Sequence, residues 1–277
     1  MRNLITIAHL TLVEARRRRI VLAGSICALA FLAVFSIAAW FAYRELASNA
    51  SVAFVERQAT LTMTMLVGFL AANFLAVTFA ILLPIDTLSG EIDSGVMQTL
   101  ASKPVSRDEI VIGKWLGHLV LALGYLLLLC CGILGTMRVL AGFTPAGVVY
   151  ALPLLMLEIA LSLTIAISGG ARFSTVTNAI FAVGLYGLSF VGGLVEYVGS
   201  VGDIKSLRTV GIVVSLFSPA DSMWRLAGHN LMPEILRGSD ALSLSASVPT
   251  PLMVWWAAGY MVVTLLLALR AFRRRSL

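Results

Sequence analysis

Apolar runs of roughly 20 residues recur along the whole of this chain, and this recurrence constrains its fold more than any other feature. A helix of that length crosses the hydrocarbon core of a bilayer, which is about 30 Å thick. Backbone polar groups find no partner in lipid, so a segment that spans it must be a helix or a strand of a closed barrel. The runs here are continuously apolar rather than alternating, which argues against a barrel. The sequence therefore predicts an all-α integral membrane protein.

Six of these runs are long enough to span a membrane. Hydrophobic residues make up 59% of the chain and charged residues only 12%, whereas a soluble domain usually carries about 25% charged residues. We expect one transmembrane domain over residues 1–277, in which the first run stays as an anchor because it is too long for a cleaved signal peptide. The predicted spans are Ile20–Tyr43, Leu61–Ile85, Ile110–Met137, Ala146–Ser168, Thr175–Val198 and Pro251–Arg270.

The positions of the basic residues predict how the chain is oriented. If the N-terminus is cytoplasmic, 13 of the 20 Lys and Arg residues lie inside and 7 lie outside. Such an excess is typical of cytoplasmic loops, so we expect both termini in the cytoplasm of a bacterial cell, with the chain in the inner membrane. The net charge of +6 comes from residues that flank apolar runs, not from a basic stretch interleaved with aromatics, so we expect no nucleic-acid partner.

Three segments outside the spans are long enough to have structure of their own. Residues 1–19 place Leu4, Ile5, Ala8 and Leu12 on one side, which predicts a helix lying on the cytoplasmic membrane surface. The cytoplasmic segment 86–109 ends in a capping box, in which Ser106 precedes Glu109 by three residues. In the extracytoplasmic segment 199–250, the stretch Ser218–Asp221 predicts the start of a short helix that ends near Gly228.

No metal site is expected from the sequence. The three cysteines, Cys27, Cys130 and Cys131, lie in apolar runs and match neither a zinc nor a disulfide framework. Soft donors do occur together in the outer segment, where copper is the metal that they would suit. These donors are Met223, His229 and Met232, whose role stays open.

One acidic residue stands near the middle of the fourth span. An ionisable group at that depth costs roughly 2.5–3.5 kcal/mol on insertion scales, so Glu158 should face a cavity or another helix. It could contact a substrate or a proton along a transport path, or it could bond Asn73 of the second span as an interhelical link. We expect His118, about one turn inside the third span, to be a packing or interface histidine.

The segment between the second and third spans carries a recognisable pattern. It contains the pair Gly90-Glu91, then Gly95 and Leu100, then the run Pro104-Val105-Ser106-Arg107 and finally Gly113-Lys114. Glycines permit tight backbone geometry, and Pro104 disfavours helix at Lys103. The pattern resembles the signature of type-2 ABC transporter permeases, and the six-span layout extends the resemblance over the whole chain.

The resemblance implies a function and a set of site residues. In such permeases the segment between spans two and three forms a coupling helix that docks into a groove of a separate ATPase. The residues that would couple are Gly90, Glu91, Asp93, Gly95, Lys103, Pro104 and Arg107. No Walker-type Gly-rich loop is present in this sequence, so we expect ATP and Mg to be bound by the partner subunit and this chain to have no enzyme activity.

The resemblance also implies an assembly of two permeases, expected to be a homodimer, with two ATPases, and transport by alternating access, with export favoured over import. Two alternatives stay open. One is an ion-gradient-driven carrier or channel that uses Glu158 as its ion site. The other is a relay that moves no substrate and passes ATPase motion to a periplasmic partner through residues 199–250. The substrate cannot be read from the sequence.

Overall fold

The computed structural model describes residues 2–17, 19–48, 53–87, 90, 106–145, 147–233 and 248–274. Within these residues the chain is helical and contains no strand. Six helices are long and apolar enough to cross a membrane, which confirms the predicted six-span, all-α fold. They are α2 (Arg19–Ser48), α3 (Phe54–Leu82), α6 (Arg107–Ala141), α7 (Val148–Gly170), α8 (Thr175–Val201) and α12 (Leu252–Arg274).

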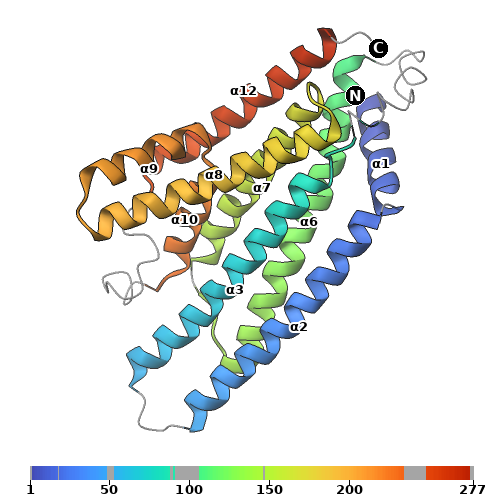
Figure 1. Cartoon of the computed structure of the whole chain (residues 1–277). Coiled ribbons are helices and arrows are strands. Elements are labelled where there is room, and N and C mark those ends of the chain that lie inside the picture. The colour runs from blue at the N-terminus through green and yellow to red at the C-terminus, as the bar shows by residue number, and fades with distance from the viewer. Residues whose placement is uncertain are drawn as a thin grey trace.

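Helix α7 lies at the centre of the bundle, in contact with α3, α6, α8 and α12. In Figure 1, α2, α3 and α6 run side by side on one flank, and α8 and α12 lie on the other. Much of α3 and α7 is buried, whereas few residues of α2 and α12 are buried. In a membrane protein these outward apolar faces meet lipid or another subunit rather than water.

The first helix, α1 (Arg2–Arg17), packs along the beginning of α6 (Figure 1). Its predicted apolar side is wrong in one respect, because Ile5 is 68% exposed whereas Thr11 is buried. The contact is set by two glycines of α6. A Cβ atom on Gly117 would lie 2.8 Å from the carbonyl oxygen of Ala8, and one on Gly113 would lie 2.7 Å from the side chain of Ile7. The α6 surface, and not lipid alone, selects the face of α1 that is buried.

Two short helices lie between the last two spans. The predicted one is confirmed as α10 (Ala220–Leu231), which runs three residues beyond Gly228 and packs on α7. The other, α9 (Lys205–Phe217), was not predicted; it folds back antiparallel along α8 (Figure 1). The two backbones approach closely, since a Cβ on Gly192 would lie 2.4 Å from Val214 and one on Gly211 would lie 2.4 Å from Glu196.

The two ends of the chain lie at the same end of the bundle. Figure 1 shows α1 and the end of α12 beside the beginning of α6. The predicted capping box is present there: Glu109 N–H donates to Ser106 Oγ over 3.2 Å, and Ser106 N–H donates to Glu109 Oε2 over 3.0 Å. An even number of spans with adjacent termini places both ends on one side of the membrane, and the cytoplasmic assignment of that side stays a prediction.

Candidate coupling junction and buried polar centre

The predicted coupling segment, residues 86–109, lies between α3 and α6, and the structure describes its two ends. Glu91, Asp93, Gly95, Lys103 and Pro104 lie outside the described residues. Gly90 is described, and its N–H donates to the carbonyl oxygen of Asp86 over 2.9 Å. Both ends of the segment are bonded to other helices.

At its beginning the segment is bonded to α6 through two buried side chains. Thr87 is 2% exposed and His118 is 1% exposed, and their Oγ1 and Nε2 atoms are 3.3 Å apart. His118 Nδ1 lies 2.8 Å from the carbonyl oxygen of Lys114, which can only accept a hydrogen bond. In the neutral imidazole, Nδ1 therefore donates to Lys114 and Nε2 accepts from the Thr87 hydroxyl. His118 is therefore buried at a contact between segments, as expected, and it also carries the hydrogen bond to Thr87.

A second buried side chain bonds the end of α3 to α8. Asn178, in the first turn of α8, donates from Nδ2 to the carbonyl oxygens of Ile85 over 3.3 Å and Ala166 over 2.8 Å. Ile85 follows α3 and Ala166 belongs to α7, so one amide joins three spans. Sequence reasoning missed Asn178, because a single amide at a span end has no local signature.

At its far end the segment is bonded to α12. Arg107 Nη1 donates to the carbonyl oxygens of Phe272 over 3.4 Å and Arg273 over 3.1 Å. A cation on the last carbonyls of a helix is also favoured by the helix dipole. The neighbouring Asp108 forms a bidentate ion pair with Arg273, whose side chain is 62% exposed. Arg107 is thus hydrogen-bonded to another helix of the same chain, near the C-terminal end of the segment 86–109.

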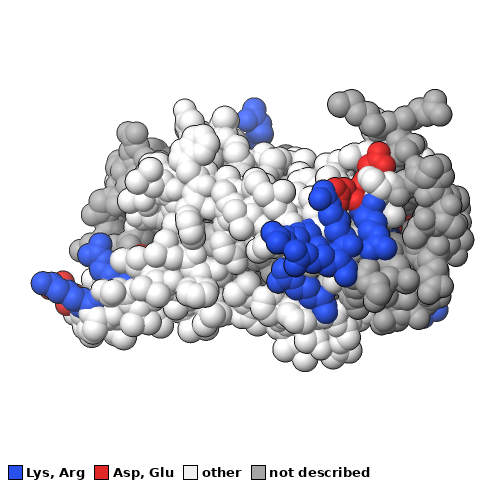
Figure 2. Space-filling view, turned by 90° about the horizontal axis from the view of Figure 1, so that it is seen from above, with Lys and Arg blue, Asp and Glu red and all other residues white. Residues whose placement is uncertain are grey.

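The surface around this junction is basic. Figure 2, looking onto this end of the molecule, shows Lys and Arg side chains gathered beside a smaller group of Asp and Glu. The described basic residues here include Arg107, Arg273 and Arg274. This is the distribution that the positive-inside rule predicts for a cytoplasmic end.

The structure also brings Glu158 and Asn73 together, in the middle of the bundle. Glu158 is 0% exposed and Asn73 is 2% exposed, and Asn73 Nδ2 donates to Glu158 Oε1 over 3.0 Å. The expected interhelical contact between α7 and α3 is therefore present. The bond leaves Glu158 Oε2 and Asn73 Oδ1 without a hydrogen-bond partner among the described residues.

A second buried charged group joins α8, α9 and α10. Arg225 of α10 pairs with Glu196 of α8, with Nη1 and Oε2 2.9 Å apart, and with Asp221, with Nε and Oδ2 3.0 Å apart. Its Nη2 donates to Ser215 of α9 over 3.0 Å. Burial raises the pKa of Asp221 to about 7, although the Arg225 guanidinium acts in the opposite direction. We call Glu196, Asp221 and Arg225 the outer ion cluster.

Sequence reasoning missed the outer ion cluster, although a signal existed. Asp221 and Arg225 are four residues apart and so lie on one face of a helix, where opposite charges meet. Glu196 lies within the fifth span, where an acidic residue needs a partner. The donors singled out for copper do not join the cluster, because Met223 and Met232 are buried in the apolar core.

Six spanning helices, a buried polar centre and a loop between α3 and α6 whose ends are bonded to other spans are typical of a multi-pass membrane transport subunit. Comparison with known families identifies the class of transport subunit to which the chain belongs. The sequence model described as "ABC-2 family transporter protein" matches residues 5–277, so the chain belongs to the ABC-2 transporter family. It is a permease of an ABC transporter in a bacterial inner membrane, and its family implies that the ATPase is a separate partner subunit.

Two curated relatives are similar to this chain. A "Probable ABC transporter permease protein NosY" from Stutzerimonas stutzeri is 28% identical over 223 residues, which cover 74% of this chain and 77% of that protein. A protein of the same description from Pseudomonas aeruginosa is 35% identical over 125 residues, which cover 44% of this chain and 41% of that one.

Proposed function

We propose that this permease forms a homodimer with two ATPase subunits and exports a substrate by alternating access. ATP and Mg bind to the ATPases, each of which receives the segment 86–109 of one permease. Glu91 is the first docking charge, with Asp93 next. ATP binding draws the ATPases together, and the docked segments carry that motion into the membrane. The description of both relatives as probable ABC transporter permeases supports this assignment.

The observation that carries the coupling proposal is the bonding of both ends of this segment to other spans. Thr87 is bonded to His118 of α6, and Arg107 is bonded to the last carbonyls of α12. Asn178 bonds the end of α3 to α8. A displacement of the segment therefore cannot stay local: it strains buried hydrogen bonds to α6 and α8, and more exposed ones to α12, unless those helices move with it.

The Glu91→Lys variant tests the docking role. Tagged wild-type protein, purified in mild detergent, should bring with it a Walker-motif ATPase in roughly equal amount. Glu91→Lys should lower the recovered ATPase and its coupled activity, because the reversed charge opposes docking, while membrane insertion stays normal. The matched control is Glu45→Lys, which makes the same charge reversal at an exposed residue near the C-terminal end of α2, outside the segment 86–109. Full coupled activity in Glu91→Lys would refute the docking role, and purification without any ATPase would refute the whole proposal.

An ion-driven carrier is the rival that Glu158 supports, because its carboxylate is fully buried and one of its oxygens has no partner among the residues that the structure describes. That rival predicts transport into vesicles without ATP, and loss of transport in Glu158→Gln. The relay alternative predicts ATPase coupling with no substrate movement. Reconstituting the complex in vesicles with and without ATP separates the three.

A further inference from the structure

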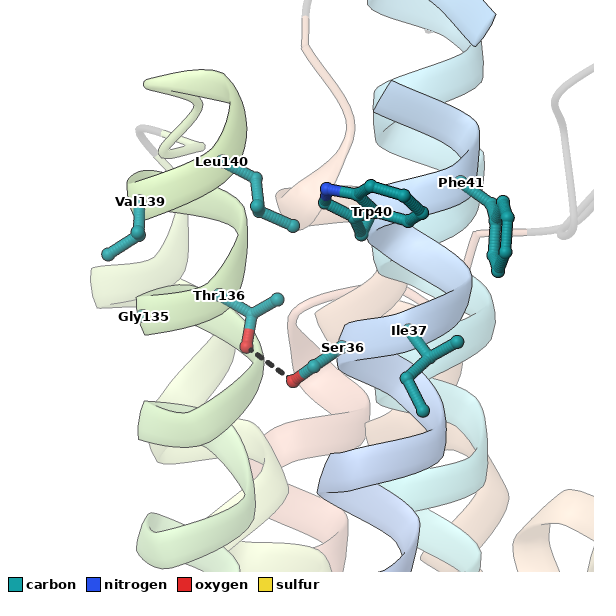
Figure 3. Close-up of a pocket in the computed structure, with 8 residues that line it drawn as sticks. All are labelled: Ser36, Ile37, Trp40, Phe41, Gly135, Thr136, Val139 and Leu140. Atoms are coloured by element: carbon teal, nitrogen blue, oxygen red, sulfur yellow. Dashed lines mark hydrogen bonds between the residues drawn. The ribbon is translucent and has the colours of Figure 1, made fainter. Parts of the chain in front are cut away.

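An apolar groove of about 600 Å³ lies between α2 and α6, a size typical of sites that hold an organic ligand. Trp40 and Leu140 point toward each other across it (Figure 3). One turn along the groove, Ser36 Oγ and Thr136 Oγ1 are hydrogen-bonded to each other over 3.1 Å. The other large side chains of the groove are apolar and exposed: Ile37, Phe41 and Val139. Because the two hydroxyls satisfy each other, the groove favours an apolar occupant.

The groove lies in the leaflet opposite the chain termini, which is the outer leaflet in the predicted topology. Helix α2 begins at Arg19 and rises about 1.5 Å per residue, so Ser36 lies about 25 Å and Trp40 about 31 Å from its start. The hydrocarbon core of a bilayer is about 30 Å thick. Ser36 is therefore at the depth of the acyl chains, and Trp40 is at the boundary with the headgroups, where tryptophan is enriched.

Two arginines lie one turn beyond the groove, toward the membrane surface. Arg44 follows Trp40 by four residues on α2, and its Cζ atom lies 5.3 Å from the centre of the Trp40 ring. Arg138 follows Gly135 by three residues on α6, so both lie on the same face of that helix. The two arginines are exposed, and neither has an ion-pair partner among the described residues. At about 38 Å from the start of α2, Arg44 reaches the depth of the lipid headgroups.

The charges at this end of the groove favour an anionic lipid over a second copy of the chain. The last two turns of α2 and α6 carry Arg44 and Arg138 but a single acidic residue, Glu45. A second copy docked here by twofold symmetry would bring two more arginines to the same patch, which like-charge repulsion opposes. A phospholipid instead supplies an acyl chain for the apolar groove and a phosphate group, which guanidinium groups bind through charge-assisted hydrogen bonds.

We propose that the groove between α2 and α6 binds an anionic phospholipid. One acyl chain lies along the groove against Trp40 and Leu140 and reaches the Ser36–Thr136 pair. The phosphate group accepts hydrogen bonds from Arg44 and Arg138. This binding involves neither ATP nor the ATPase, so it can be measured on the permease alone.

The test uses the full chain in nanodiscs of phosphatidylcholine that contain a small fraction of lipid with brominated acyl chains, because bromine quenches tryptophan fluorescence on contact. The probe is brominated phosphatidylglycerol, and the comparison is brominated phosphatidylcholine. The signal of Trp40 is the difference between the wild type and Trp40→Phe. We expect half-quenching of this signal at an about fivefold lower fraction of the anionic lipid, the usual gain from one net basic charge at an anionic surface.

Trp255 gives the matched control within the same chain. It is 77% exposed and lies near the beginning of α12, away from the α2–α6 groove. Its signal, taken as the difference from Trp255→Phe, should show no preference between the two lipids. Equal quenching of Trp40 by both lipids would show ordinary lipid contact and overturn the proposal. Quenching of Trp40 by neither would show that protein covers the groove, which also overturns it.

Charge variants test the headgroup contact. Arg44→Gln and Arg138→Gln should each remove most of the preference for phosphatidylglycerol, whereas Arg208→Gln, at an exposed arginine of α9, should leave it unchanged. In detergent without phospholipid, neither groove variant should alter the unfolding temperature, because these arginines act on bound lipid. A preference that survives in the double variant would overturn the headgroup assignment.

Shape variants test the acyl-chain contact. Gly135→Leu adds a side chain in the groove, where a Cβ meets no atom within 4 Å, and should lower the quenching of Trp40 by both lipids. The control is Gly124→Leu on the same helix, which is equally open but lies outside the groove. Wild-type quenching in Gly135→Leu would overturn the acyl-chain assignment. Native mass spectrometry of the wild-type chain needs no variant; it should retain phosphatidylglycerol in preference to phosphatidylcholine, and equal retention would contradict the proposal.

Discussion

Replacing Arg225 by methionine should destabilise the protein more than any exposed substitution, because Arg225 is the shared cation of two buried carboxylates. Its side chain is 8% exposed, and those of Glu196 and Asp221 are 5% and 7% exposed. Methionine keeps the length of the apolar stem but removes the charge and the donor to Ser215. The variant thus leaves two neighbouring buried carboxyl groups without the cation that they share.

The expected cost follows from that burial. Removing one partner of a buried ion pair typically costs about 3–5 kcal/mol, whereas an exposed ion pair contributes about 0–1 kcal/mol. For a chain of this size that loss corresponds to a fall in the unfolding temperature on the order of 10 °C. The triple variant that also carries Glu196→Gln and Asp221→Asn should recover much of the loss, because no uncompensated charge remains.

The assay is thermal unfolding in mild detergent, with Arg138→Met as the control, since Arg138 is exposed and donates a long hydrogen bond of 3.5 Å to Thr144. Proteolysis of the α9–α10 region at a fixed temperature gives a local readout. If Arg225→Met unfolds at the wild-type temperature, or if the triple variant is as unstable as the single one, the outer ion cluster is not what holds α10 on α8.

Three further predictions use different parts of the molecule. Gly117→Ala should separate α1 from α6 and raise protease cleavage of α1, because the added Cβ would lie 2.8 Å from the carbonyl oxygen of Ala8. The control is Gly124→Ala on the same helix, where a Cβ meets nothing within 4 Å; it should leave the protein as stable as the wild type or more stable. Thr87→Val keeps the side-chain shape but removes the donor to His118, so it should lower transport per ATP hydrolysed while ATPase binding stays normal; unchanged coupling would exclude this bond from transmission. The pKa of Asp221 is about 7 in the folded protein and about 3.9 in the unfolded chain, so the folded protein binds this proton more tightly. The protonated Asp221 therefore contributes its full stability below about pH 4, and this contribution is lost as the pH rises to about 7. Asp221→Asn should flatten unfolding temperature against pH over that window, and an unchanged pH profile would contradict the assignment.

Much of the fold could be predicted because the need to satisfy backbone hydrogen bonds in lipid applies to each span separately. A backbone in hydrocarbon must satisfy its own hydrogen bonds, so the length and polarity of a run are enough to identify a helix. All six predicted spans correspond to helices, and the capping box at Ser106 is present. Helix α9 was missed because its 13 residues are too short to span a bilayer, and its folding back on α8 depends on close approach at Gly192 and Gly211.

The candidate sites follow the same rule as the fold, because those with a local signal in the sequence could be predicted. The sequence marked Glu158 as needing a partner and suggested Asn73, because the energetic cost of a carboxylate in lipid is local to that residue. It also pointed to segment 86–109, through a pattern that is contiguous in the chain.

By itself, then, the sequence determined the number of spans, the membrane setting and the family, since each rests on features that lie next to one another in the chain. Only the tertiary structure decided that Thr87 meets His118, that Arg107 holds the end of α12, and that Arg225 joins two carboxylates. Most of these partners come from separate helices, and their contact depends on how those helices cross and rotate. Helix crossing is set by the summed packing of many weakly interacting side chains in the bundle, so no single segment specifies it.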